Sequence, residues 1–515
     1  MAQARRSNGM VTSRGASSPG VFNPGLFDQG LAHHRAGRLA EAEEIYRRIL
    51  TADGRHADAW HLLGVIAFER GRNEAALNFI GNAIRLDDRQ PAYYNNFGNA
   101  LFELGHPAEA ESAYSAALAL DPHYAEACSN RGNALRALGR LEDSEAAYRA
   151  SLRRRPNQPE THNNLGNTLQ IMGREAEAEA CFRKAVRLRP DYADAHSNLG
   201  HALLLRGRFA EAWPEYEWRL RTRQTALSRK LPTPRWTGAP LEGRTLLIHA
   251  EQGLGDNLQF CRYATEVAAS AGGPVVLEVQ APLVRLMASL AGDMRVVGRS
   301  DVLPDHDLHC PLLSLPGVLG LTLETLPPPA PYLSVAPELV AAWTQRLSGR
   351  PGLKVGLVWA GGSRPDQPMV EAIDRRRSIT LQTMAPLAQA PGVCFVSLQK
   401  DGPGQQARTP PAGMALADFT EEMGDFLDTA ALIGALDLVI SVDTAVAHLA
   451  GALGKPVWLL NRFDTCWRWL KDRDDSPWYA GLRQFRQPAP GDWGAVMQAV
   501  AAALTSEAAG RRLAA

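Results

Sequence analysis

A 34-residue rhythm of glycines runs through the first part of this 515-residue chain. Two sets of glycines keep that spacing, offset from each other by seven residues: Gly30, Gly64, Gly98, Gly132, Gly166 and Gly200, then Gly37, Gly71, Gly105, Gly139, Gly173 and Gly207. A single compact core does not impose such a period. The rhythm predicts stacked copies of one supersecondary unit, each burying its apolar face against its neighbours. The remainder of the chain does not repeat, so we expect a repeat array joined to a different module.

Each repeat reads as two helices with a turn at the second glycine. Small residues recur at one position of the second helix, and large ones recur four residues later on the same helical face. The small ones are Ala42, Ala76, Ala110, Ser144, Ala178 and Ala212, and the large ones are Tyr46, Ile80, Tyr114, Tyr148, Phe182 and Tyr216. Over residues 23–226 this pattern resembles the tetratricopeptide consensus, which implies an α-helical superhelix of six repeats.

Asparagines recur on one face of the first helices. The set, which we call the asparagine ladder, is Asn96, Asn99, Asn130, Asn133, Asn164, Asn167 and Asn198. Asparagine is a poor helix former, so its repetition inside helices needs a reason. One interpretation is an amide ladder that binds the backbone of an extended peptide, and the ladder resembles that of the protein O-GlcNAc transferases. The alternative is that these amides only link neighbouring repeats.

Composition excludes several classes of function. Lys plus Arg equals Asp plus Glu, at 55 each, so no overall charge recruits nucleic acid. Six scattered cysteines without a CxxC pair indicate a reducing compartment rather than a disulfide frame or a zinc site. No apolar run is long enough to span a membrane. We therefore expect a cytoplasmic protein without nucleic-acid partners, metal or membrane span.

From Arg244 the pattern changes to short apolar strands separated by helix-length segments. The predicted strands are TLLIHA, PVVLEV, MRVV, KVGLVWAG, VCFVSL, LDLVISV and KPVWLL. Such alternation predicts parallel sheets covered by helices on both faces, and the length favours two Rossmann-like lobes over one. Ligands bind such sheets at the carboxyl ends of the strands.

Two strand-to-helix turns carry the candidate chemistry. After the first strand, Gly253 and Gly255 allow close approach of the backbone, and Asp256 either caps a helix starting near Asn257 or acts as a general base. After the strand LDLVISV, Asp443 and Thr444 precede a helix whose first amides suit a diphosphate. His448, four residues on, either joins that site or packs against the sheet.

Together the two turns resemble the heptosyltransferase-like glycosyltransferases of family 9, over about residues 241–490. The resemblance rests on Gly255-Asp256 and on the segment from Asp443 to His448. It implies a GT-B fold, Asp256 as catalytic base, and Asp443, Thr444 and His448 as donor binders. Ala445 stands where the family has glycine, which weakens any inference of a heptose donor.

Several other residues of the second half bear on the same site. Of the cations in DRRRSITL we select Arg377, with Ser378 beside it, to neutralise and bind a leaving diphosphate; a solvated basic loop is the alternative. Gln399 and Lys400 also follow a strand and are candidates for the cleft. We expect Trp467, Trp469, Trp478 and Tyr479 to pack in a core rather than stack on a base or sugar. We expect His306 and His309 to lie beside a turn, and no other residue is spaced from them as a metal ligand would be.

The predicted organisation has six parts. They are a disordered tail (1–22), six repeats (23–226), a linker (227–240), an amino-terminal acceptor-side lobe (241–336), a carboxyl-terminal nucleotide-sugar lobe (337–505) and a tail (506–515).

The resulting hypothesis is a glycosyltransferase that uses a nucleotide-sugar as co-substrate and needs no other cofactor. Its acceptor would be a Ser or Thr of a protein held by the repeats, a domain pairing similar to the O-GlcNAc transferases. Inversion and metal independence follow from the family resemblance. Three alternatives stay open: a glycan or lipid-linked acceptor with the repeats as docking module, an inactive scaffold that binds peptides, and an unrelated nucleotide-binding enzyme of the same fold.

Overall fold

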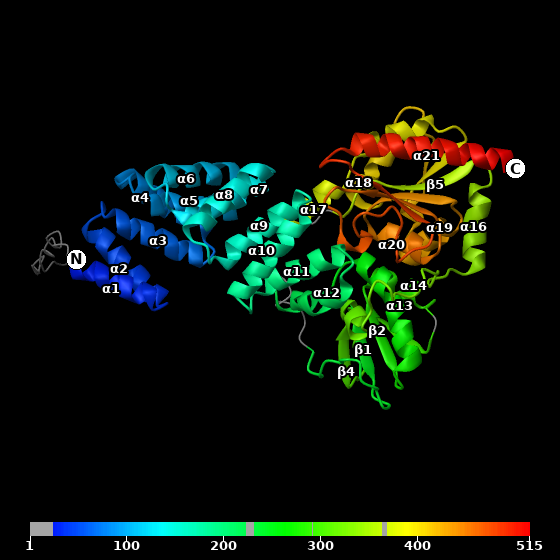
Figure 1. Cartoon of the computed structure of the whole chain (residues 1–515), viewed down its shortest axis with the longest axis horizontal. Coiled ribbons are helices and arrows are strands. Elements are labelled where there is room, and N and C mark those ends of the chain that lie inside the picture. Colours follow the sequence, from blue (N-terminus) through cyan, green and yellow to red (C-terminus); the bar gives the residue numbers. More distant parts are fainter. Residues whose placement is uncertain (1–23, 223–230, 291, 363–367, 515) are drawn as a thin grey trace, which may run out of the picture. The chain divides into compact units, whose positions relative to one another are not determined.

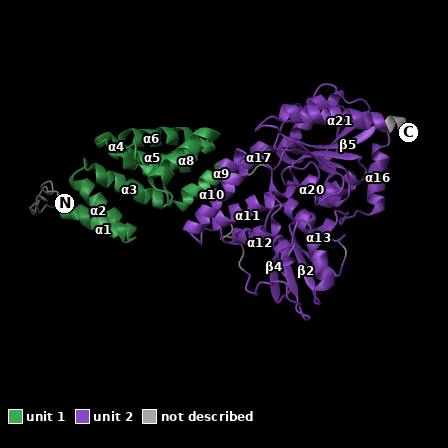
Figure 2. Ribbon diagram, in the orientation of Figure 1, with its two compact units in different colours: residues 1–168 green, residues 169–515 purple. Residues whose placement is uncertain are grey.

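A computed structural model describes residues 24–222, 231–290, 292–362 and 368–514 (Figure 1). The chain forms two compact units, residues 1–168 and 169–515 (Figure 2). The predicted tail 1–22 and part of the predicted linker lie outside the described residues. Among the described residues, no helix is long and apolar enough to cross a membrane.

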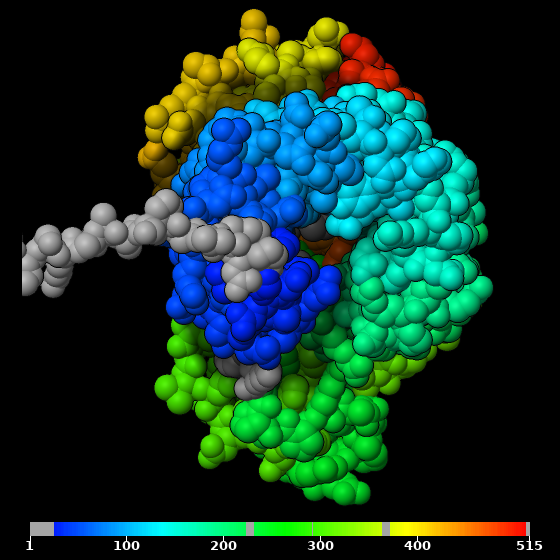
Figure 3. All heavy atoms as spheres, turned by 90° about the vertical axis from the view of Figure 1, so that its left-hand side faces the viewer, coloured from blue at the N-terminus to red at the C-terminus, as the bar shows by residue number. Residues whose placement is uncertain are grey.

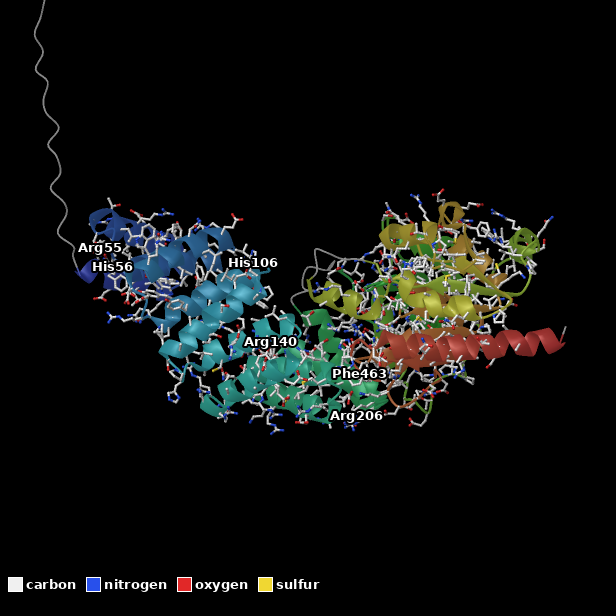
Figure 4. The ribbon with its side chains drawn as sticks, turned by 90° about the horizontal axis from the view of Figure 1, so that it is seen from above. Arg55, His56, His106, Arg140, Arg206 and Phe463 are labelled. Carbon is white, nitrogen blue, oxygen red and sulfur yellow. The ribbon has the colours of Figure 1, made fainter. Side chains whose placement is uncertain are left out.

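Helix pairs build the repeat array, as the glycine rhythm predicts. The pairs are α1 (Pro24–Arg35) with α2 (Leu39–Ala52), α3 (Ala57–Glu69) with α4 (Asn73–Leu86), α5 (Pro91–Glu103) with α6 (Pro107–Leu120), α7 (Ala125–Ala137) with α8 (Leu141–Arg154), α9 (Pro159–Ile171) with α10 (Glu175–Leu188), and α11 (Ala193–Leu205) with α12 (Phe209–Tyr216). In the first unit the repeats follow one another along an arc, from blue to cyan in Figure 3. His106 and Arg140, 34 residues apart, precede α6 and α8 at equivalent turns (Figure 4).

The two glycine sets have different physical roles. The second set forms the turns: all six have φ between 70° and 83°, a left-handed conformation that glycine adopts without strain. The first set makes room for large side chains. A Cβ on Gly98 would lie 2.7 Å from the ring of Tyr114, and one on Gly132 would lie 2.6 Å from Tyr148. Glycine therefore lets the two helices of a repeat pack closely.

Two parallel sheets follow the repeats, with strand orders β3-β2-β1-β4 and β10-β9-β8-β5-β6-β7. The first contains β1 (Leu246–His249), β2 (Val275–Val279), β3 (Met294–Gly298) and β4 (Leu308–Pro311). The second contains β5 (Leu353–Val358), β6 (Val393–Ser397), β7 (Leu416–Asp418), β8 (Leu438–Val442), β9 (Val457–Asn461) and β10 (Leu482–Arg486). Every ladder is parallel, and all seven predicted strands are present.

Helices and short 3-10 turns connect the strands. The helices are α13 (Leu254–Ser270), α14 (Val284–Met287), α15 (Leu315–Val318), α16 (Pro337–Leu347), α17 (Pro368–Arg377), α18 (Asp401–Gly404), α19 (Phe426–Gly434), α20 (Ala445–Ala452) and α21 (Trp493–Ala514). Helix α21 continues to Ala514, through most of the segment expected as a tail. The three arginines of DRRRSITL, for which a solvated basic loop was the alternative interpretation, form the last turn of α17. His309, expected beside a turn, lies within β4, where Trp236 donates a backbone hydrogen bond to its carbonyl.

The last repeat packs against both sheets' connecting segments. Trp213 of α12 donates from Nε1 to the carbonyl of Leu321, 2.7 Å away. The ring of Phe209, also on α12, stacks on Trp478 with centroids 5.8 Å apart. The last two-helix repeat is therefore part of the same packed core as the α/β region.

Candidate functional site

The two predicted turns meet in the structure. Helix α13 begins after β1, α20 begins after β8, and the two helices pack together at their first turns. Gly255 permits this contact, because a Cβ there would lie 2.8 Å from Cδ2 of His448 and 3.4 Å from Cα of Ala445. Two helix amino termini, each the positive end of a dipole, are thus brought to one place.

Asp256 is the third residue of α13, which begins at Leu254 rather than near Asn257 as expected. The helix starts earlier because Gly253 takes the capping position and its N–H donates to Oδ2 of Asp256, 2.9 Å away. The other carboxylate oxygen, Oδ1, forms an ion pair with Arg468. Both side chains are mostly buried, with 17% and 11% of their surfaces exposed. In this structure both oxygens of the proposed base have partners.

Thr444 occupies the capping position of α20, but its side chain makes no capping hydrogen bond. Its hydroxyl instead lies 3.0 Å from the hydroxyl of Ser441. The first amides of α20 consequently have no side-chain acceptor from the capping residue. Such uncapped amides are the groups that bind anions at helix amino termini.

Asp443 and Arg377 are joined through the backbone. Nη1 of Arg377 donates to the carbonyl oxygen of Asp443, 2.9 Å away, and the same guanidinium pairs with the buried Asp374. Burial alone would raise the pKa of the Asp443 carboxyl, but the charges of Arg377 and its neighbours outweigh this and hold that pKa below its ordinary value. Asp443 is therefore a carboxylate at neutral pH.

Ser378 is also committed to a neighbour. Its hydroxyl accepts the N–H of Gly361, 3.0 Å away, just after β5. Gly361 itself lies against Arg377, since a Cβ on that glycine would meet the guanidinium at 2.6 Å. Ser378 and Arg377 thus lie at the carboxyl edge of the second sheet, as expected from the strand pattern.

His448 is enclosed by aromatic rings. Only 4% of the residue is exposed, its Nδ1 lies 2.8 Å from the hydroxyl of Tyr479, and its ring stacks on Trp469 with centroids 4.8 Å apart. Burial lowers its pKa to about 4, so the imidazole is neutral at neutral pH. It can hold a hydrogen bond here but adds no positive charge for a diphosphate.

Two arginines that sequence reasoning did not select lie at this site. Arg468 follows β9 and pairs with Asp256, and Arg462, directly after β9, is 8% exposed. Nε and Nη1 of Arg462 are buried and form no hydrogen bond with any residue of the described parts, but Nε lies 3.5 Å from Oδ1 of Asp464 in an ion pair. Arg462 also contributes to lowering the pKa of Asp443. Its position after a buried strand that neighbours β8 was the one available sequence signal.

The aromatic segment after β9 is core, as predicted. Trp467, Trp469, Trp478 and Tyr479 are each at most 3% exposed. Trp467 contacts Trp213 and Tyr216 of α12 as well as Phe260 of α13.

The remaining predicted residues of the second half have structural contacts. Oε1 of Gln399 accepts the N–H groups of Trp359 and Ala360, at 3.0 and 2.8 Å. Lys400 donates to the carbonyl of Met423. In the described ranges no group of three or more His, Cys, Asp or Glu side chains is arranged to hold a metal ion.

The asparagine ladder links neighbouring repeats. Nδ2 of Asn130 donates to Oδ1 of Asn99 at 3.1 Å, and Nδ2 of Asn164 donates to Oδ1 of Asn133 at 3.0 Å. Tyrosine hydroxyls donate to the same two acceptors, Tyr114 to Asn99 and Tyr148 to Asn133. Asn96 bonds to His61 in the preceding repeat.

All seven ladder residues, including Asn167 and Asn198, are half-buried. Within the described parts of the chain, no hydrogen bond uses Nδ2 of Asn99 or Asn133. The inter-repeat links therefore leave these two amide groups as donors.

Sequence comparisons support the two-part organisation. The family profile of the cilia and flagella-associated protein 70 C-terminal domain matches residues 11–228. The profile of glycosyltransferase family 9 (heptosyltransferase) matches residues 422–460, which contain β8, the Asp443–His448 segment and β9. This second match suggests a glycosyltransferase-type function for the α/β region.

One curated relative is protein FlbA of Caulobacter vibrioides, 29% identical over 320 residues. The match covers 58% of this chain and 52% of the relative, so the chain spans about half of that protein's length.

Three solved structures are similar to part of the chain. MamA is 23% identical with a TM-score of 0.29, over 33% of this chain and 92% of its own. YrrB, described as a TPR protein with an unusual peptide-binding site, is 20% identical with a TM-score of 0.30, over 33% and 88%. PilW, a type IV pilus biogenesis factor, is 23% identical with a TM-score of 0.35, over 39% and 95%.

Proposed function

We propose that this protein is a glycosyltransferase that moves a sugar from a nucleotide-diphosphate donor to an acceptor hydroxyl. The observation that carries the proposal is that α20, which lies within the segment matched by the family 9 profile, meets α13 at the first turns of both helices. Uncapped amides of α20 and the nearby guanidiniums of Arg377, Arg462 and Arg468 give this place the positive charge that a diphosphate requires.

We assign the donor diphosphate to the first turn of α20. Thr444 supplies a hydroxyl there, and Arg462 supplies a buried Nη1 with no hydrogen bond to any described residue, beside an Nε that pairs with Asp464 at 3.5 Å. As the diphosphate departs, negative charge develops on its oxygens next to these donor groups. Because the donor groups are already in position, they stabilise that charge without reorganisation. Asp443 keeps Arg377 close to the same edge through its carbonyl. We further propose that the two parallel sheets form the lobes of a GT-B fold. As the family resemblance implies, transfer would then be a direct displacement that inverts the sugar and needs no metal ion.

The chemistry also needs a group that takes the proton from the acceptor hydroxyl. Family resemblance gives this role to Asp256, next to Gly253 and Gly255 on the acceptor side. For Asp256 to act, its carboxylate has to be released from Arg468.

Donor binding is tested by calorimetry of wild type against UDP, GDP, ADP and dTDP. We expect one nucleotide to bind, Thr444→Val to weaken it about 2- to 12-fold, and Arg462→Met to weaken it about 10- to 150-fold, corresponding to a lost neutral and a lost charged hydrogen bond. Thr344→Val on α16, an exposed threonine outside the β8 edge, is the matched control and should bind as wild type. If no nucleotide binds wild type, the donor site and the transferase function are both wrong.

We further propose that the acceptor is a peptide bound along the asparagine ladder. The free Nδ2 donors of Asn99 and Asn133 recur at the repeat interval and suit the carbonyls of an extended backbone. Replacing both by aspartate keeps their acceptor oxygens and removes these donors. Transfer to protein acceptors in a cell extract should then fall, while release of nucleotide with water as acceptor stays unchanged.

Asn78→Asp on α4, an exposed asparagine outside the ladder, controls for added charge. Unchanged protein labelling by the Asn99 and Asn133 double variant would instead favour a glycan or lipid-linked acceptor.

A second candidate function, an inactive scaffold, is favoured by one observation. Both oxygens of Asp256 are engaged in this structure. A nucleotide that binds wild type but is never released from any sugar donor would select the scaffold.

A further inference from the structure

The last repeat departs from the ladder at one position. The register that holds Asn99, Asn133 and Asn167 holds His201 in α11, 34 residues after the last of them. Helix α11 lies in the same compact unit as both sheets and packs against the 3-10 turn Trp467–Trp469 that contains Arg468. The substitution of asparagine by histidine thus occurs in the repeat that borders the candidate site.

Hydrogen bonding fixes which nitrogen of His201 carries the proton. Nδ1 lies 2.7 Å from the carbonyl oxygen of Ser197, and because a carbonyl only accepts, Nδ1 donates. Nε2 of the neutral ring therefore has a lone pair. No described residue forms a hydrogen bond with Nε2, and the residue is partly exposed. A histidine held by one nitrogen with the other open is the arrangement of a positioned base.

Charged and aromatic groups of four elements face this ring. Tyr216 of α12 meets it edge-on, with centroids 5.2 Å apart. Burial first, then the charges of Arg468 and Arg219, lower the pKa of His201 to about 4, while the bond to Ser197 and the charge of Asp256 act in the opposite direction. His201 is consequently neutral, and able to accept a proton, at neutral pH.

The nearby carboxylates are already paired. Asp256 holds the N–H of Gly253 and Arg468, while Glu251 holds Arg219 and accepts from Leu313. Compared with Asp256 and Glu251, His201 is the group whose basic atom, Nε2, forms no hydrogen bond with any described residue.

We propose that His201, rather than Asp256, is the general base of the transfer, an inference that rests on the proposed transferase function. The O–H bond of the acceptor breaks and its proton passes to Nε2. The oxygen's electron pair forms the new bond to the anomeric carbon, and the bond from that carbon to the diphosphate breaks with its electrons leaving on phosphate oxygen. The imidazolium then loses its proton to water.

We expect a bound donor to raise the pKa of His201. The diphosphate adds negative charge near Arg468, which offsets the cations that depress the pKa of His201. In the donor complex we therefore expect an apparent pKa between about 4 and the ordinary 6.5. The rate should fall as the pH falls through that value, because the protonated ring cannot accept the acceptor's proton.

The experiment measures kcat and KM for nucleotide release, and how both depend on pH. The sugar donors are UDP-glucose, UDP-N-acetylglucosamine, GDP-mannose and ADP-glucose. The proteins compared are wild type, His201→Asn, His201→Gln and Asp256→Asn. His201→Asn introduces the residue that the three preceding repeats have at this register, so we expect it to fold, which its circular dichroism checks. His201→Gln is the second variant. The matched control is His196→Asn on the same helix, whose Nδ1 and Nε2 contact Glu215 and the Pro190 carbonyl.

We expect both His201 variants to lose about 10²- to 10⁴-fold in kcat, with the donor KM within about twofold and the acidic limb of the pH profile gone. His196→Asn should keep the limb. If His201→Asn keeps the wild-type kcat, or loses rate but keeps the acidic limb of the pH profile, His201 is not the base. If only Asp256→Asn loses the acidic limb, Asp256 is the general base instead. A wild type that releases nucleotide from no donor refutes the transferase function itself, and with it the inference.

Discussion

The ion pair between Asp256 and Arg468 joins the start of α13 to the segment after β9, and Asp256→Asn tests what it contributes. The variant keeps the shape of the side chain and an oxygen for the N–H of Gly253, 2.9 Å away. It removes the negative charge beside a guanidinium whose side chain is only 11% exposed. The perturbation therefore isolates the charge from the packing.

Removing one partner of a buried pair leaves the other charge uncompensated, at about 3–5 kcal/mol. Arg468 keeps two other contacts, with Sγ of Cys466 at 3.2 Å and with the ring of Trp467 at 4.6 Å. We therefore expect the lower end, about 3 kcal/mol less free energy of unfolding for Asp256→Asn. The double variant Asp256→Asn with Arg468→Met removes both charges and should be at least about 1 kcal/mol more stable than Asp256→Asn alone.

Urea unfolding followed by tryptophan fluorescence suits this measurement, because Trp467, Trp469 and Trp478 are buried around the pair. Asp475→Asn, which removes a carboxylate paired with Arg473 and 69% exposed, is the matched control and should change stability by less than about 1 kcal/mol. A loss of less than about 1 kcal/mol for Asp256→Asn, or a double variant as unstable as the sum of its parts, would refute the reasoning. The same stability values set the temperature at which the kinetics of Asp256→Asn can be compared with wild type.

Three further predictions follow from single contacts. Gly255→Ala adds a Cβ 2.8 Å from a ring carbon of His448 and should lower stability by about 1–3 kcal/mol in urea unfolding, whereas Gly362→Ala, with nothing within 4 Å, should not. Because the pKa of His448 is about 4 when folded and 6.5 when unfolded, the unfolded state binds more protons between these values. Stability should therefore fall by about 3 kcal/mol from pH 6.5 to 4, and His448→Gln should flatten that slope in unfolding curves measured across the range. Tyr148→Phe removes the hydroxyl that donates to Asn133 at 2.7 Å and should cost about 0.5–1.5 kcal/mol, seen as a lower thermal midpoint of the repeats.

The sequence predicted the repeats and the central strands because both carry strong periodic signals. The three strands it missed, β4, β7 and β10, each lie at the edge of a sheet. An edge strand is less enclosed, so its sequence carries polar residues: LHCP in β4, LAD in β7 and LRQFR in β10. The apolar runs by which central strands are recognised are absent there.

The candidate site was predictable as two turns but not as a set of contacts. Strand ends placed Asp256 and Asp443 at the carboxyl edges of two sheets, where the structure has them. The partner of Asp256 is 212 residues away, in a segment whose tryptophans predicted a core and gave Arg468 no distinguishing pattern. His201 could be recognised only by comparing registers across repeats, because histidine in an isolated helix has no special meaning.

The packing of the last repeat bears on how the two halves of the chain cooperate. Trp467 contacts α12 and α13 at once, and Arg219, just after α12, pairs with Glu251, two residues beyond β1. A docking module on a flexible tether would share neither a hydrophobic core nor a buried ion pair with the sheets. Here the last repeat, which belongs to the same compact unit as both sheets, supplies part of the wall beside Asp256. If the proposed transfer takes place beside Asp256, substitutions in α11 and α12 should alter its rate.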